Sequence, residues 1–201
     1  MIHPSTKLVH INDEVGYGVV ATDFIPIGTI TYVKDDMEIV LEEAHRLHLD
    51  NRYKDLIEKY SYTEADGSKV LSWDIAKYVN HSCNCNTLST GYGFEIAIRD
   101  IHPGEQVTDD YGMFHIESEM VCLCGADSCR QIIGRNEFLE NSVDWDNLAR
   151  KALSCFEKVS QPLIDFLGKE ILMDLKRYLI NNNHYRSVTN LQLNNLQDVA
   201  V

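Results

Sequence analysis

Three cysteines near the middle of the chain have the spacing of metal ligands. Cys122, Cys124 and Cys129 form a C-x-C-x4-C pattern. Thiolates at such spacings can reach one tetrahedral Zn²⁺ ion, which holds each sulfur at about 2.3 Å. A closed structural site needs a fourth ligand, and either Cys83 or Cys85 would supply it from upstream. The spacing predicts one structural zinc ion, with packed free thiols or a redox pair as the alternatives.

The cysteine usage and the charge of the chain bear on its compartment and partners. Six clustered cysteines in 201 residues, without an N-terminal signal pattern, favour metal ligation over disulfides in a reducing compartment. The net charge of −13 repels nucleic acid phosphates and favours basic partners. A zinc site that binds nucleic acid is therefore not expected, and we expect the cysteines to stabilise a loop instead. The sequence contains no apolar run of about 18 residues, so it predicts no membrane-spanning segment. We expect an intracellular protein, nuclear or cytoplasmic, with a secreted bacterial effector as the alternative.

The apolar pattern predicts short strands with irregular links, followed by a helical tail. β-branched and aromatic runs between Gly and Pro turns predict two strands within 15–33 and further strands at 69–73, 94–100 and 106–108. Recurring apolar residues predict a helix over 42–60. The fold class is therefore mainly β with α, an α+β protein.

Two further helices are expected after the composition shifts near residue 140. Ser142 and Asp144 are candidate N-caps of a helix over about 144–159, and Pro162 indicates the start of a helix reaching about Asn181. The second helix has an apolar stripe that something must cover. It could dock on the preceding domain, form a dimer or bind a partner.

The order of four motifs resembles the SET-domain family. The matching segments are Gly16–Ala21 (first glycine motif), Asn80–Cys83 (Asn-His-Ser-Cys core), Gly104–Tyr111 (Gly-Glu-…-Asp-Tyr motif) and Cys122–Arg130 (post-SET cysteine segment). A glycine pair alone is weak, but the other three motifs at these distances form a specific combination. The resemblance covers about residues 7–134.

This resemblance implies a fold and a division of the chain. The SET-domain fold consists of small curved sheets with a knot-like crossing, where the Asn-His-Ser-Cys and Asp-Tyr segments meet. We expect a SET domain over 1–118 with a helical insert at about 42–60, a post-SET zinc segment over 119–134 and a C-terminal helical region over 135–201.

The resemblance also implies an activity, the transfer of a methyl group from S-adenosylmethionine to lysine side chains of proteins. Basic substrates such as histones would suit the acidic chain. The implied catalytic residue is Tyr111, whose hydroxyl would align a neutral lysine amine. The implied donor-binding residues are Gly16, Tyr17, Gly18, Lys77, Asn80 and His81. The implied zinc ligands are Cys83, Cys122, Cys124 and Cys129.

Two positions depart from the family pattern. Cys85 stands where many members carry a proline, and Asp109 stands where many carry an aromatic residue that influences how many methyl groups are added. The number of methyl groups therefore stays open. Two other functions also stay open: a catalytically impaired SET-like binding module, and a zinc-stabilised scaffold that recruits partners through its helical tail.

Overall fold

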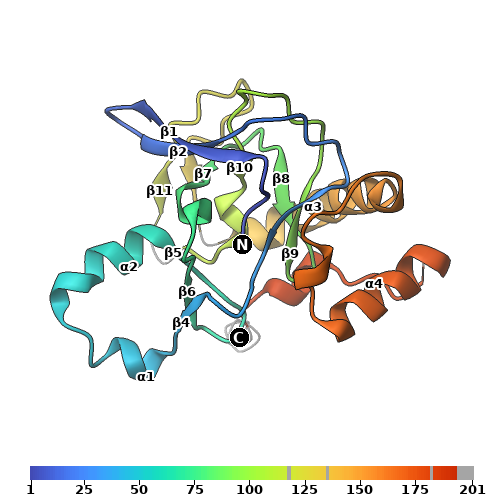
Figure 1. Cartoon of the computed structure of the whole chain (residues 1–201). Helices are drawn as coiled ribbons and strands as arrows, with labels where there is room; N and C mark the ends of the chain where they lie inside the picture. The colour runs from blue at the N-terminus through green and yellow to red at the C-terminus, as the bar shows by residue number, and fades with distance from the viewer. Residues whose placement is uncertain (117–118, 135, 182, 194–201) are drawn as a thin grey trace.

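The computed structural model describes residues 1–116, 119–134, 136–181 and 183–193. The strands of these residues form small separate sheets, and helices pack around them (Figure 1). No helix among the described residues has the length and apolar character needed to cross a bilayer.

Two three-stranded antiparallel sheets carry most of the strand pairing. One has the order β3 (Ile30–Val33), β9 (Phe94–Ala97), β8 (Thr87–Ser89). The other has the order β4 (Ile39–Leu41), β6 (Lys69–Leu71), β5 (Ser61–Thr63). Both sheets join strands that are distant in sequence, so neither could form from one hairpin.

Three two-stranded pairs complete the β structure. They are the hairpin of β1 (Thr6–Asn12) with β2 (Gly16–Ala21), the parallel pair of β7 (Asn80–His81) with β10 (Thr108–Asp109), and the antiparallel pair of β11 (Met120–Val121) with β12 (Ile132–Ile133). The parallel pair brings together the two segments that the family resemblance places at its crossing.

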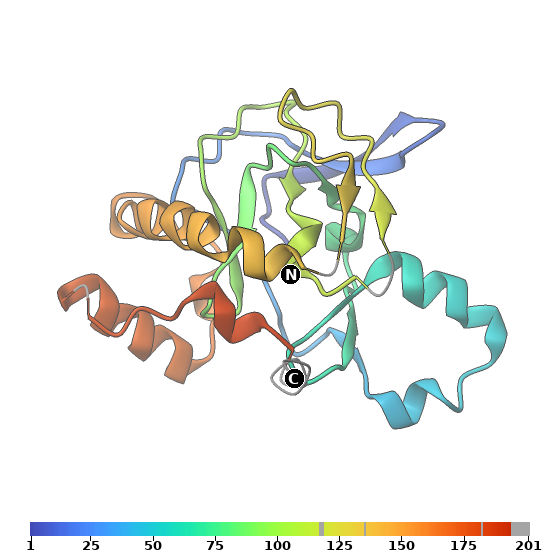
Figure 2. The same ribbon diagram turned by 180° about the vertical axis from the view of Figure 1, so that it is seen from behind.

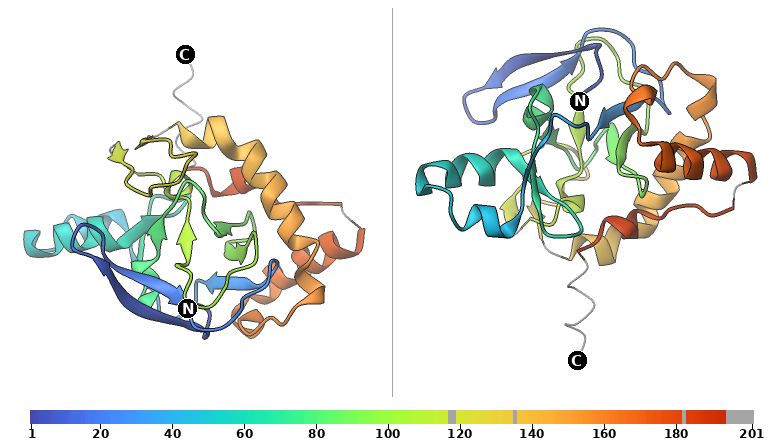
Figure 3. Two further views of the ribbon diagram at one scale, coloured as in Figure 1. Left: turned by 90° about the horizontal axis from the view of Figure 1, so that it is seen from above. Right: turned by 60° about the horizontal axis from the view of Figure 1, so that its bottom comes forward.

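The helices lie on two opposite sides of the sheets (Figure 2). On one side are α1 (Glu43–Arg46), the 3₁₀ turn η1 (Asn51–Tyr53) and α2 (Lys54–Tyr60). On the other are α3 (Glu137–Leu153) and α4 (Lys169–Asn181), as Figure 3 also shows. Short 3₁₀ turns connect the rest: η2 (Ile75–Tyr78), η3 (Tyr111–Met113), η4 (Phe156–Lys158), η5 (Ile164–Phe166) and η6 (Val188–Leu191).

The main core lies between the β3-β9-β8 sheet and the C-terminal helices. Leu88 and Phe94 of the sheet share one buried cluster with Trp145 of α3 and with Leu175 and Tyr178 of α4. Burial of such large side chains stabilises a fold by about 1.5–3 kcal/mol each. The apolar stripe of the last helix is therefore covered in large part by this chain's own domain.

Three of the predicted helices have different bounds in the structure. The 42–60 segment is broken, because the Asp50 carboxylate accepts the Arg52 N–H and starts a new turn. The helix expected from 144 begins at Glu137, since Phe138 extends its buried face backwards. The helix expected from 162 begins at Lys169, directly after Gly168, and only the turn η5 precedes it.

Candidate active site

The parallel pairing of β7 with β10 positions the residues expected to do chemistry. Thr108 pairs with Asn80 and Asp109 with His81. The Ser82 N–H donates to the Asp109 carbonyl at 3.0 Å, which continues the pairing by one residue. Tyr111, two residues beyond Asp109, therefore lies beside the Asn-His-Ser-Cys segment although about thirty residues separate them in sequence.

The Tyr111 hydroxyl is held by one specific hydrogen bond. It donates to the Val79 carbonyl at 2.7 Å, and its ring packs near those of His81 and Phe114. Burial, together with the charges of Asp109 and Glu95, raises the pKa of Tyr111 above its ordinary value. The hydroxyl thus stays protonated, and its oxygen lone pairs remain available to accept a hydrogen bond from an amine.

Two adjacent cavities lie near this tyrosine, which lines the larger of them. The larger, of about 640 Å³, is lined by Tyr111, Asp109, Lys77 and residues of α2 and β5. The smaller, of about 300 Å³, lies against Met113 and Asp66. The residues that line both cavities form their common wall: Tyr32, Tyr62, Thr63, Glu95 and Phe114.

Two carboxyl groups project into the larger cavity beside Tyr111. Asp109 is 1 % exposed, and its Oδ1 accepts the Asp110 N–H at 2.7 Å. Its Oδ2 is buried and accepts no N–H or hydroxyl donor from the described residues. Glu95, from the neighbouring strand β9, lies within hydrogen-bonding reach of Asp109. Nothing in the sequence pattern singled out Glu95, because only the sheet brings it to this cavity.

The predicted donor-binding residues do not all share this cavity. Lys77 lines it, and the Lys77 Nζ lies 3.1 Å from the Asp74 carbonyl. The glycine motif forms β2, whose residues do not line this cavity, and it is tied to Asn80, whose Nδ2 donates to the Tyr17 carbonyl at 3.0 Å.

Gly18 has a role that its spacing did not reveal. A Cβ on Gly18 would lie 2.8 Å from Asn80 Nδ2 and 2.6 Å from Gln106 Oε1. These two side chains also bond to each other at 2.8 Å. Gly18 therefore permits Asn80 to reach the β2 backbone. Gly16, in contrast, has open space around it and a φ of 81°, which an L side chain rarely adopts.

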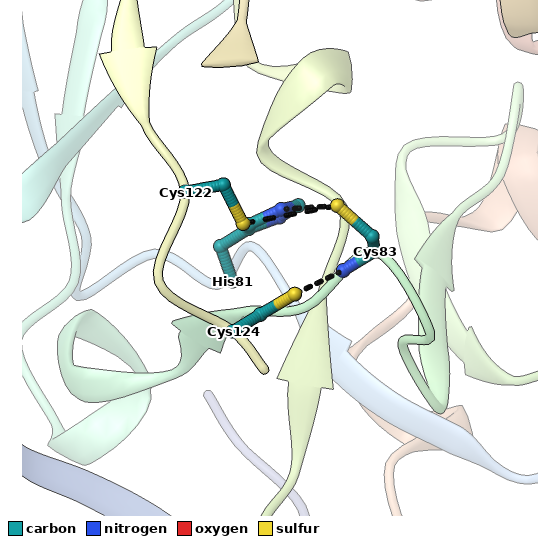
Figure 4. A group of neighbouring side chains, drawn as sticks. All are labelled: His81, Cys83, Cys122 and Cys124. Atoms are coloured by element: carbon teal, nitrogen blue, oxygen red, sulfur yellow. Dashed lines mark hydrogen bonds between the residues drawn. The ribbon is translucent and has the colours of Figure 1, made fainter. Parts of the chain in front are cut away.

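The cysteines of the predicted zinc site converge. Figure 4 shows Cys83, Cys122 and Cys124 pointing toward one another with His81, and the ligand atoms of these four residues lie within 4.8 Å of each other. The sulfurs of Cys83 and Cys122 are 3.8 Å apart. A tetrahedron with metal–sulfur bonds of about 2.3 Å has edges of about 3.8 Å. The cluster therefore fits a Zn²⁺ ion.

Cys129 lies beside this group of four, with its thiol 3.8 Å from the Cys122 carbonyl oxygen. Burial opposes ionisation of Cys124, but hydrogen bonds from the backbone of Cys83 and Ala126 and from neighbouring thiols lower its pKa to about 6. A thiolate is the form that binds metal.

His81 faces the cluster as a hydrogen-bond donor. Its Nδ1 lies 3.1 Å from the Tyr111 backbone N, whose N–H can only donate. The Asp109 carbonyl is also 3.2 Å from this nitrogen, but the Tyr111 N–H assigns the ring proton to Nε2. Nε2 lies 3.4 Å from the Cys83 sulfur. His81 thus links the cysteine cluster to the backbone of Tyr111, and burial lowers its pKa.

One arginine that the sequence did not single out connects the cysteine segment to α3. Arg130 donates to the carboxylates of Asp110 and Glu137, and its backbone N–H lies 3.3 Å from the Cys83 sulfur. Asp110 also accepts the Trp145 indole N–H at 3.1 Å. This network holds the cysteine segment, η3 and α3 in one arrangement.

Comparison with known proteins assigns the central part of the chain. Residues 16–112 match the family described as SET domain. The chain contains a SET domain. The matched region includes the glycine motif, the β7–β10 pair and Tyr111, whereas the cysteine segment and the C-terminal helices follow it.

Relatives of this SET domain come from several organisms. A putative histone-lysine N-methyltransferase of Arabidopsis thaliana, ASHH4, is 26% identical over 202 residues, covering 90% of this chain and 54% of that protein. An H3 lysine-36 specific histone-lysine N-methyltransferase of Cryptococcus neoformans is 27% identical over 143 residues, covering 63% of this chain and 16% of that protein. The chain therefore spans about half the length of the first relative. Since residues 1–134 are only two thirds of the chain, that similarity continues into the C-terminal helices.

A solved structure shares the fold of this SET domain. The structure of Arabidopsis thaliana SUVH6 in complex with SAM matches with a TM-score of 0.50 at 18% identity, covering 66% of this chain and 33% of that chain. The expected fold of small sheets with helices, mixed α and β, is confirmed.

Proposed function

We propose that this protein is an S-adenosylmethionine-dependent methyltransferase that acts on lysine side chains of proteins. The observation that carries the proposal is the Tyr111 hydroxyl, which lines the larger cavity and donates a hydrogen bond to the Val79 carbonyl. Its oxygen can accept an N–H bond and so orient an amine lone pair. Alignment in a site that excludes water is the main requirement for methyl transfer to an amine.

The relatives support lysine as the acceptor. Both are named as histone-lysine N-methyltransferases, although their identities of 26% and 27% leave the substrate protein open. The net charge of −13 favours a basic peptide such as a histone tail. We therefore propose a lysine-bearing basic segment as the substrate and a nuclear or other intracellular location.

Residues around η2 and β7 fit the methyl donor. Asn80 uses its Nδ2 twice, for Tyr17 and Gln106, which leaves its Oδ1 as an acceptor for an amino group. The Lys77 ammonium at the cavity wall offers a partner for a carboxylate. Gly16 and Gly18 keep side chains away from the adjoining backbone. The donor, when bound, supplies an electrophilic methyl group.

We further propose that Cys83, Cys122, Cys124 and Cys129 hold one structural zinc ion within a post-SET segment over 119–134. The Sγ–Sγ distance of 3.8 Å and the contacts of Cys122 with the other three thiols support this set. The Nε2 proton of His81 leaves it as a donor to Cys83. Such a donor orients a ligand and tunes the charge on its sulfur.

The proposed activity is tested with radiolabelled donor and a mixture of histones. Tyr111→Phe keeps the ring and removes the oxygen that would hold the amine, so methyl transfer should fall by about 100-fold or more. Tyr53→Phe is the matched control, since this tyrosine is exposed on η1. Equal transfer by both variants, or none by the wild type on a broad panel of basic proteins, would contradict the proposal.

A second function is favoured by Asp109. A buried carboxyl group in the place of an aromatic residue changes the environment of the amine, and a binding module without turnover would tolerate such a change. Calorimetry with S-adenosylmethionine distinguishes the two functions. Donor binding without methyl transfer to any tested protein would support the binding module.

A further inference from the structure

Glu95 occupies the wall between the two cavities, next to the proposed catalytic tyrosine. It is one of the residues that line both cavities, and its charge acts on the Tyr111 hydroxyl. It comes from β9, in the centre of the β3-β9-β8 sheet, so its backbone is fixed by pairing on both sides. A carboxyl group held so rigidly beside an amine site is positioned for proton transfer.

Asp109 determines the state of this carboxyl group. Its Oδ2 is buried without any N–H or hydroxyl donor from the described residues, and its side chain lies within hydrogen-bonding reach of Glu95. Two carboxylates in such contact cannot both be ionised. Burial, the charge of Glu95 and their hydrogen bond raise the pKa of Asp109 well above its ordinary value. Asp109 therefore stays protonated and donates a hydrogen bond to Glu95.

Glu95 remains the group that titrates near neutrality. Burial raises its pKa to about 7, while the hydrogen bond from Asp109 and the α-amino group of Met1 limit the rise. An acceptor with a pKa near the working pH combines an available base form with sufficient basicity.

The other ionisable groups around the two cavities do not offer an equivalent base. Burial raises the pKa of Tyr32, Tyr62 and Tyr111, which stay neutral, and lowers the pKa of His115.

Several further charges face the cavities at their walls. Glu58, Lys59 and Lys77 line the larger cavity, and Glu64 and Asp66 line the smaller. Lys34 pairs with Glu64 at 2.6 Å, and Asp110, which adds to the field at Asp109, is occupied by Arg130. Glu58 extends from α2 with a side chain 54% exposed. Among the carboxyl groups that line the larger cavity, Asp109 is buried and Glu95 is half-buried, whereas Glu58 is exposed.

We propose that Glu95 is the proton acceptor for the target ammonium and that protonated Asp109 is its positioning residue. The proposal rests on the methyltransferase function above. One N–H bond of the ammonium breaks as one O–H bond forms on Glu95. The amine becomes neutral, the carboxylate becomes a carboxylic acid, and the total charge of the two is zero before and after. The proton leaves later to solvent through the open side of the cavity.

The step answers a requirement of the substrate. A free lysine has a pKa of about 10.4, so only about one amine in 2,500 is neutral at pH 7. Desolvation in the cavity lowers the pKa of the bound amine, Glu95 provides a local acceptor for its proton, and Tyr111 orients the lone pair that results. Glu95 thus accepts the proton, and Tyr111 aligns the amine.

The kinetic test compares Glu95→Gln with Asp109→Asn. Glu95→Gln keeps the shape and removes the base, so kcat should fall about 100-fold near pH 7 and continue to rise with pH where the wild-type rate levels off. Asp109→Asn keeps a neutral donor to Glu95 and should retain the wild-type pH profile. Glu58→Gln, which removes an exposed carboxylate from the same cavity, should change kcat less than about twofold. Donor affinity by calorimetry should be unchanged in all three.

A second measurement does not depend on turnover. In ¹³C spectra of the free protein, one glutamate carboxyl should titrate near pH 7, and its signal should be absent from Glu95→Gln. If no carboxyl titrates above about pH 5.5, Glu95 is an ordinary acid and the inference is wrong. This measurement also decides the case if Glu95→Gln does not fold.

The outcomes separate the two proposals. Wild-type methyl transfer with an unchanged pH profile in Glu95→Gln would overturn the proton acceptor and leave the methyltransferase standing. A loss of kcat with an unaltered profile would likewise overturn it, because it would show a role in packing alone. Absence of transfer by the wild type would overturn both.

Discussion

Replacement of Arg130 by methionine should destabilise the protein by removing the link between the cysteine segment and α3. The Arg130 side chain is 24% exposed, while those of its partners Asp110 and Glu137 are only 7% and 8% exposed. Methionine retains much of the apolar stem but leaves two buried carboxylates without their cation. Asp110 still accepts hydrogen bonds from Trp145 and Gly112, so part of its charge stays satisfied.

The expected magnitude follows from that burial. Removal of one partner from a buried ion pair costs about 3–5 kcal/mol, and the partial exposure of Arg130 places the loss at the lower end, about 3 kcal/mol. For a chain of this length the melting temperature should fall by roughly 6 to 12 °C. Arg177→Met is the matched control, because its pair with Asp174 involves an arginine 63% exposed. That variant should lose less than about 1 kcal/mol.

The assay is urea unfolding of both variants, followed by a double-mutant cycle of Arg130→Met with Glu137→Gln. The cycle should return a coupling energy of about 1 kcal/mol or more, since the two side chains contact each other directly. Equal stability losses for Arg130→Met and Arg177→Met would refute the reasoning. So would strict additivity of Arg130→Met with Glu137→Gln.

Three further predictions follow from the same structure. Because burial raises the pKa of Glu95 to about 7, the folded state binds this proton more tightly than the unfolded state does. The free energy of unfolding should therefore decline between about pH 4.5 and pH 7, by up to about 3 kcal/mol. Unfolding experiments across that range should show no such decline for Glu95→Gln. Elemental analysis of protein purified without chelator should find about one zinc per chain, and a metal-free wild type would count against the site. Removal of the zinc by a chelator should lower both the melting temperature and the donor affinity. The control variant Cys155→Ser, which lies outside the cluster, should retain the zinc. Gly18→Ala should lower donor affinity and stability, because its methyl group would collide with Asn80 and Gln106, whereas Gly134→Ala, with open space at its Cβ, should keep donor affinity in calorimetry; equal affinities would show that the Gly18 approach is dispensable.

The fold was predictable where local chemistry is decisive. Turn residues and β-branched runs indicated several strands, and the motif order indicated the family. The helix bounds were predicted less well, because tertiary burial set them: Phe138 is buried and extends α3 by two turns before the expected caps. The broken helix at 42–60 has few buried residues, so the local cap at Asp50 prevails.

The cysteine spacing by itself indicated that Cys122, Cys124 and Cys129 could share a metal, because residues so close in sequence can lie within a few ångströms, but it left the fourth ligand open between Cys83 and Cys85. The motif order likewise singled out Tyr111 as the candidate catalytic residue. Only the tertiary structure decided which side chains meet at the cavity. Glu95 and Asp109 lie on different strands, and nothing in their local sequence couples them. The same holds for Arg130, whose contact with Cys83 joins positions 47 residues apart, and for His81, whose contact with the Tyr111 backbone joins positions 30 residues apart. Such long-range contacts arise from sheet pairing and burial, which set the charge and proton positions on which the proposed chemistry depends.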